Sequence, residues 1–116
     1  MDYTDRLRRL AINDERIAES ETGDLVGGSG HLDPKSLALA RIAALVSVGG
    51  AEPSFGAQID AAISAGTTPA QIVDVLVGVI PIVGLPRVVA AAPKVALALG
   101  HDLEIDVDEI GAGDPR

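Results

Sequence analysis

Residues 61–73 read AAISAGTTPAQIV and contain the clearest structural signal in the chain. A run of small apolar residues stops at Gly66, where a helix can end because glycine readily adopts a positive φ. Thr68, Pro69 and Gln71 then follow in the order of N-cap, first helical position and capping-box partner. This stretch predicts one helix over about 53–65 and a second helix over about 69–79.

Helix signals continue outward in both directions from this stretch. Asp33 and Pro34 open a helix that we expect to run to about Val48. Its apolar residues surround most of its circumference, which favours burial or a place in a subunit interface. On the other side, residues 85–99 predict a helix with a kink at Pro93.

The two ends of the chain differ from this middle part in composition. We expect an N-terminal amphipathic helix, whole or broken, over about 3–18, and a glycine-rich loop that completes residues 1–31. Residues 32–101 form the expected helical core, and residues 102–116 form an acidic tail. Apolar and acidic residues alternate in the tail, which favours an extended segment packed in a groove over an isolated strand.

Length and composition place the chain in a fold class. Its 116 residues fit one domain, and 47% of them are hydrophobic while only 2% are aromatic. Small aliphatic side chains allow helices to pack closely. The expected fold is therefore all-α, with five or six helices built around an antiparallel helical hairpin.

Charge and targeting signals exclude several partners. The net charge is −8, and no basic stripe interrupts the acidic balance, which argues against nucleic acids and anionic membranes as partners. No uncharged stretch reaches the ~18 residues of a membrane helix. The N-terminus lacks the features of a secretion signal, so we expect a cytoplasmic protein.

The absence of cysteine restricts the chemistry further. With no cysteine in the sequence, a disulfide, a thiolate metal site and a thiol nucleophile are all impossible. The two histidines, His31 and His101, stand in no metal-binding spacing. We expect neither a metal ion nor a cofactor.

The order of these segments resembles the carboxymuconolactone decarboxylase family, which includes the alkyl-hydroperoxidase AhpD-like proteins. The similarity rests on the capping-box turn, the Val-Gly-Leu-Pro hinge at 83–86 and the alanine-rich helix that ends Leu-Ala-Leu-Gly at 97–100. Residues 39–46 and 61–69 resemble the segments on either side of the family's active-site helix. The resemblance covers about 32–102 and implies the family's helical fold, assembled into homo-oligomers, most often trimers or hexamers.

The family's catalytic motif is missing from this sequence. In the redox branch a Cys-x-x-Cys-x-x-x-His motif would fall on Ala51, Ser54 and Gln58. Neither alanine nor serine can cycle through a disulfide, so thiol peroxidase activity is excluded. The decarboxylase branch is similar in placing a histidine at the position of Gln58, and glutamine does not titrate as a general acid or base would.

A few polar residues near the motif positions remain as candidates for a binding pocket. Arg41 lies among apolar residues, and an ion pair with Asp60 or Asp74 is favoured over contact with a ligand. The Ser54 hydroxyl is expected to bond first-turn amides rather than act as a nucleophile. Arg87 stands at a helix start, where a positive charge is slightly unfavourable unless a partner or ligand faces it. The candidate pocket consists of Gln58, Ser54, Arg41 and Arg87.

Two functions of different classes remain open. In the first, the protein binds or converts a small organic acid or lactone beside Gln58, and Arg41 or Arg87 holds a carboxylate. The alternative is a non-catalytic, oligomeric structural or interaction protein on the same scaffold. Saturable binding of a small acid distinguishes the first from the second.

Overall fold

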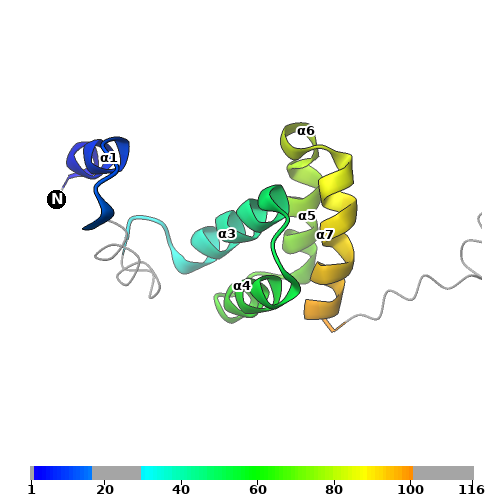
Figure 1. The fold of residues 1–116 in the computed structure, drawn as a ribbon. Helices are drawn as coiled ribbons and strands as arrows, with labels where there is room; N and C mark the ends of the chain where they lie inside the picture. The colour runs from blue at the N-terminus through cyan, green and yellow to red at the C-terminus, as the bar shows by residue number, and fades with distance from the viewer. Residues whose placement is uncertain (1, 17–29, 101–116) are drawn as a thin grey trace, which may run out of the picture. The chain divides into compact units, whose positions relative to one another are not determined.

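A computed structural model of the chain describes residues 2–16 and 30–100, and every regular element in these two ranges is a helix. This confirms the all-α prediction. The described residues fall into two compact units divided after Leu37. The helices are α1 (Tyr3–Ala11), α3 (Pro34–Val48), α4 (Glu52–Ser64), α5 (Pro69–Gly78), α6 (Ile80–Val83) and α7 (Leu85–Ala98) (Figure 1). The predicted tail contact and most of the glycine-rich loop lie outside the described residues.

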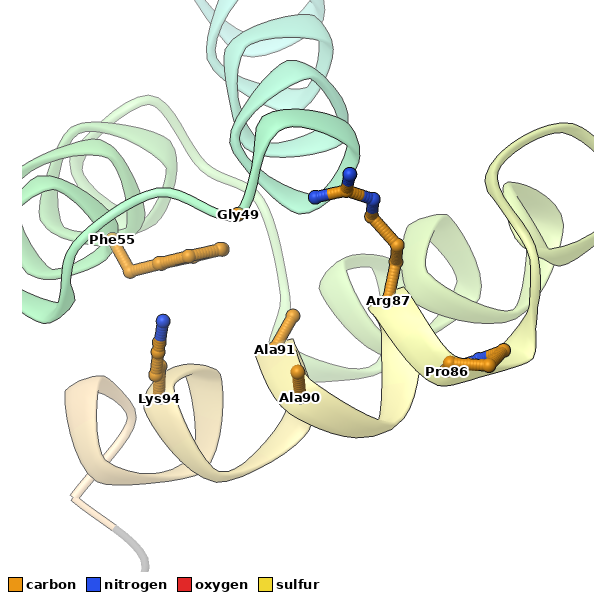
Figure 2. A pocket seen from close by; sticks show the side chains of 7 residues that line it. All are labelled: Gly49, Phe55, Pro86, Arg87, Ala90, Ala91 and Lys94. Carbon is orange, nitrogen blue, oxygen red and sulfur yellow. The ribbon is translucent and has the colours of Figure 1, made fainter.

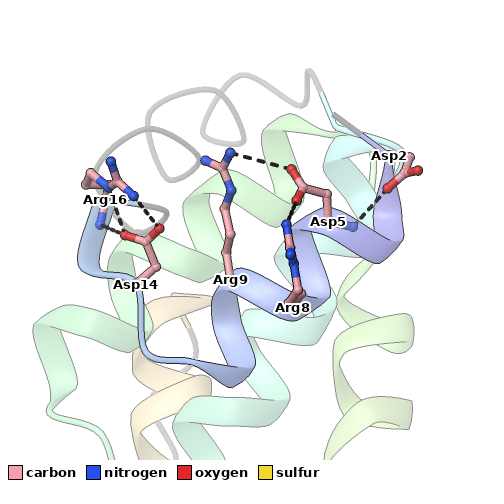
Figure 3. Close-up of polar contacts among 6 residues, drawn as sticks. All are labelled: Asp2, Asp5, Arg8, Arg9, Asp14 and Arg16. Atoms are coloured by element: carbon pink, nitrogen blue, oxygen red, sulfur yellow. Dashed lines mark hydrogen bonds and ion pairs between the residues drawn. The ribbon is translucent and has the colours of Figure 1, made fainter.

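Helix α1 has strong local signals at its start. Asp2 is its N-cap and accepts a hydrogen bond from the Asp5 amide at 2.8 Å (Figure 3). One turn later, Arg8 Nη2 donates to Asp5 Oδ1 at 2.7 Å. This hydrogen bond holds the pKa of the Asp5 carboxyl below its usual range. No residue of α1 is buried, so these local contacts rather than core packing define the helix in this unit.

The same helix ends earlier than the apolar spacing predicts. It stops at Ala11, whereas the sequence predicts a helical segment up to about residue 18. Asn13 adopts a φ of 59°, a left-handed conformation that interrupts a right-handed helix and that asparagine tolerates better than most residues. Asp14 and Arg16 pair at 3.0 Å just beyond this turn. The expectation of a broken helix is therefore the one that the structure supports.

The core of the second unit lies among α3, α4, α5 and α7. Helices α5 and α7 run antiparallel beside each other, with the single turn α6 between them (Figure 1). Helix α4 packs against α7 as well. The largest fully buried side chains are Phe55, Ile42, Ile59, Ile72, Val46 and Val95. An antiparallel helical hairpin is thus present, as the sequence predicts.

Helix α3 is less buried than its composition suggests. Asp33 Oδ1 accepts a hydrogen bond from the Ser36 amide at 2.6 Å, which confirms the predicted start of the helix. Only Ala38, Ile42 and Val46 are buried, and Val48 at the other end is 71% exposed. Burial within this chain therefore accounts for one apolar face of α3. That the other apolar faces lie in a subunit interface stays a prediction.

The turn between α4 and α5 has the predicted capping box. The Gln71 amide donates to Thr68 Oγ1 at 3.2 Å, and the Thr68 amide donates to Gln71 Oε1 at 3.0 Å. Gly66 has a φ of 96°, the conformation for which glycine was expected at the end of α4. This turn orients α5 and with it one wall of the core.

Loss of the capping box should have a measurable cost. Thr68→Ala is expected to lower the free energy of unfolding by about 1 kcal/mol, because an amide at the start of α5 loses its acceptor. Thr68→Ser keeps the hydroxyl and should cost less. Urea unfolding followed by circular dichroism measures both variants, and equal costs would contradict a role for the hydroxyl.

The described helices also bear on membrane insertion. None of the helices within residues 2–16 and 30–100 is long and apolar enough to span a bilayer. The longest of them, α3, has 15 residues.

Candidate functional site

Three of the four candidate residues line one pocket between α3 and α4. Arg41 comes from α3, while Ser54 and Gln58 lie one turn apart on α4. The rest of the lining is apolar and comes from α3 as Ala44, Leu45 and Val48. We call this cavity of about 390 Å³ the Gln58 pocket.

Among the polar side-chain atoms of the residues that line this pocket, the amide oxygen of Gln58, Oε1, is buried without a hydrogen-bond partner in the described part of the chain. A buried acceptor without a partner costs about 1–3 kcal/mol of stability, and most such groups in proteins are paired. A donor on a bound molecule would remove this cost.

Arg41 supplies the only formal charge among the described residues that line the Gln58 pocket. Its side chain is half-buried, and it forms no ion pair with Asp60, Asp74 or any other described residue. The expected ion pair with one of these aspartates is therefore absent from the part of the chain that the structure describes. The guanidinium keeps its donors available for a carboxylate.

Ser54 differs from the expectation that its hydroxyl satisfies first-turn amides. Helix α4 begins after Ala51, which provides no side-chain cap, and the Ser54 hydroxyl makes no hydrogen bond within the described residues. The described lining also contains no histidine or carboxylate that could activate this hydroxyl. Ser54 is therefore placed as a polar contact and not as a nucleophile.

Arg87 lies apart from the other three candidates, in a neighbouring pocket of about 260 Å³. It stands at the start of α7, and its guanidinium lies beside Gly49 at the end of α3 (Figure 2). A Cβ atom on Gly49 would be 3.2 Å from Arg87 Nη1. The carbonyl end of α3 favours a positive charge, which offsets the unfavourable position of Arg87 at a helix start. The lining of this Arg87 pocket is Gly49, Phe55, Pro86, Arg87, Ala90, Ala91 and Lys94.

Sequence reasoning missed Lys94, the second cation of the Arg87 pocket. Lys94 Nζ donates to the Gly50 carbonyl oxygen at 2.9 Å and lies 5.9 Å from the centroid of the Phe55 ring. Arg87 and Lys94 are seven residues apart on one helix, which places them on the same face. This spacing on an otherwise uncharged helix is the signal that could have found Lys94.

The described residues contain no cluster of metal-ligating side chains. Within residues 2–16 and 30–100, no three His, Asp or Glu side chains converge on a common point. What the two pockets offer is cationic and hydrogen-bonding groups over apolar walls. Such a lining suits a small organic anion.

Comparison with known protein families identifies the family of this chain. The model of the carboxymuconolactone decarboxylase family matches residues 14–97. No curated protein and no solved structure matches the chain significantly.

Proposed function

Because the chain belongs to the carboxymuconolactone decarboxylase family, we propose that it binds a small organic acid or lactone in the Gln58 pocket. Two observations carry the proposal: Gln58 lines the same cavity as Arg41, which has no ion-pair partner among the described residues, and the Oε1 atom of Gln58 is buried without a hydrogen-bond partner. A ligand with both a carboxylate and a hydroxyl group would satisfy these two side chains together.

The ligand's charged end is assigned to Arg41. A guanidinium can hold a carboxylate through two parallel N–H···O bonds, which fixes its orientation as well as its position. Gln58 Oε1 accepts a hydrogen bond from a ligand hydroxyl. Leu45 and Val48 contact the carbon skeleton and exclude water from one side of it.

The lining supports binding and orientation more than proton transfer. None of the polar side-chain types in this lining, a guanidinium, a hydroxyl and an amide, exchanges a proton near pH 7. A general acid or base works best when its pKa lies near the operating pH. Polarisation of a bound carboxylate by Arg41 is the chemistry that these residues supply.

Two substitutions test the assignment. We expect the wild type to bind 4-hydroxybenzoate, which carries both a carboxylate and a hydroxyl, saturably in isothermal titration calorimetry. Arg41→Gln should bind it about tenfold or more weakly, since a charge-assisted contact is lost. Gln58→Leu should also weaken binding. The same variant should stabilise the ligand-free protein by about 1–3 kcal/mol, because an unpaired buried acceptor is replaced by an apolar group of similar size.

A matched control keeps the electrostatics constant. Lys35→Gln removes one positive charge from α3, as Arg41→Gln does, but Lys35 is not among the described residues that line the Gln58 pocket or the Arg87 pocket. Equal weakening by both variants would show that only the overall charge matters, and would contradict the proposal. Absence of saturable binding by the wild type would contradict it as well.

A non-catalytic, homo-oligomeric protein is the second candidate function, and an exposed apolar groove on the hairpin favours it. The described residues that line a cavity of about 430 Å³ between α5 and α7 are all apolar, among them Val73 and Val77, which are 48% and 60% exposed. Contiguous exposed apolar surface of this kind often marks an interface. Light scattering that finds a trimer or hexamer, together with no acid binding in calorimetry, would favour this candidate over the first.

A further inference from the structure

We propose that the Arg87 pocket is a second anion site, independent of the Gln58 pocket, that takes a small monocarboxylate with a compact apolar body. It goes beyond the proposed function because it uses different residues on a different helix, α7.

The charges of this pocket all have one sign. Arg87 and Lys94 are its two charged side chains, and none of the described residues that line it is acidic. Arg87 forms no ion pair within residues 2–16 and 30–100. Both cations line one small cavity, and a bound anion is attracted to each of them.

Structural roles use only part of the hydrogen-bonding capacity of these cations. Lys94 has three N–H donors, of which the contact with the Gly50 carbonyl occupies one. Arg87 has five N–H donors, and none of them bonds another described residue. Stabilising the carbonyl end of α3 therefore leaves several donors for the oxygens of a ligand.

The rest of the lining determines which kind of chemical group the ligand carries beside its carboxylate. The remaining lining is apolar: Pro86 and Ala90 are exposed, while Phe55 and Ala91 are buried, with 0% and 4% of their surfaces exposed. Figure 2 shows Lys94 Nζ directed toward the Phe55 ring. An acid with a short apolar group can bury that group here, which a bare phosphate ion cannot do. A cavity of about 260 Å³ suits a molecule of the size of benzoate.

The single phenylalanine of the chain provides the measurement. Because Phe55 is the one Phe in the sequence, its ring signals can be assigned without ambiguity in the NMR spectrum of the full-length protein. Titration with benzoate should shift these signals saturably, and inorganic phosphate at the same ionic strength should shift them much less. Unmoved Phe55 signals, or equal shifts with benzoate and phosphate, would overturn the proposal.

Matched variants separate this site from the Gln58 pocket. Arg87→Gln and Lys94→Met should each weaken benzoate binding about tenfold, and Arg41→Gln should leave it within about twofold. Helical content measured by circular dichroism shows whether each variant is folded. Because Arg87 is exposed, Arg87→Gln should disturb the fold less than Lys94→Met. Equal weakening by Arg41→Gln would overturn the proposal. Failure of 4-hydroxybenzoate to bind at the Gln58 pocket would leave this proposal unaffected.

Discussion

Replacement of Phe55 by alanine should lower the free energy of unfolding by about 3–5 kcal/mol. Phe55 is fully buried, with 0% of its surface exposed, and lies in the cluster that α3, α4, α5 and α7 form together. Its neighbours are mainly Ala, Val and Ile side chains, which are too short to close the cavity that alanine would leave. A domain of ordinary stability has about 5–15 kcal/mol in total, so this variant should approach the threshold of unfolding.

Chemical denaturation followed by circular dichroism tests this expectation. Phe55→Leu is the control, since leucine keeps most of the buried volume and should cost clearly less than alanine. A loss below about 1 kcal/mol for Phe55→Ala, the average for any point mutation, would show that the helices collapse around the smaller residue and that the core does not depend on this ring.

Gln58→His should raise the rate at which the protein decarboxylates carboxymuconolactone, by roughly 10²–10⁴-fold over the wild type. In that reaction the C–C bond to the carboxylate breaks, CO₂ leaves, and the electron pair on carbon takes a proton. An imidazole at position 58 would supply this proton beside Arg41, which holds the substrate in the proposed function. The rate should follow the titration of the imidazole, which has a pKa of about 6.5 when unperturbed.

Two control variants isolate the effect of the new imidazole. Ala57→His places the same group one residue away on α4, at an exposed position outside the described lining of the Gln58 pocket, and should give no gain. Gln58→Met removes the amide without adding a titratable group and should also give none. A Gln58→His protein that folds and binds the lactone without turning it over would show that the pocket has diverged beyond this one residue.

Local signals in the sequence were sufficient for most helix boundaries. The capping box of Thr68 and Gln71 and the N-cap Asp33 appear in the structure where the sequence predicts them. These signals involve residues three positions apart, so no distant part of the chain is needed to form them. A broken N-terminal helix was one of the two expectations, but the position of the break after Ala11 was not predicted, because the left-handed conformation of Asn13 does not alter the apolar spacing.

The candidate site could be predicted only in part. Ser54 and Gln58 share a helix face by their spacing, whereas the side on which Arg41 approaches them depends on how α3 packs against α4. The same packing places Arg87 beside the end of α3 and in a separate pocket with Lys94.

By itself, the sequence determined the all-α class, the family resemblance and the loss of thiol chemistry, because these depend on residue type and local spacing. Only the tertiary structure decided which polar groups share a cavity and which stay without a partner. The unpaired Gln58 Oε1 is such a case, since burial and hydrogen bonding depend on atoms that distant segments bring together.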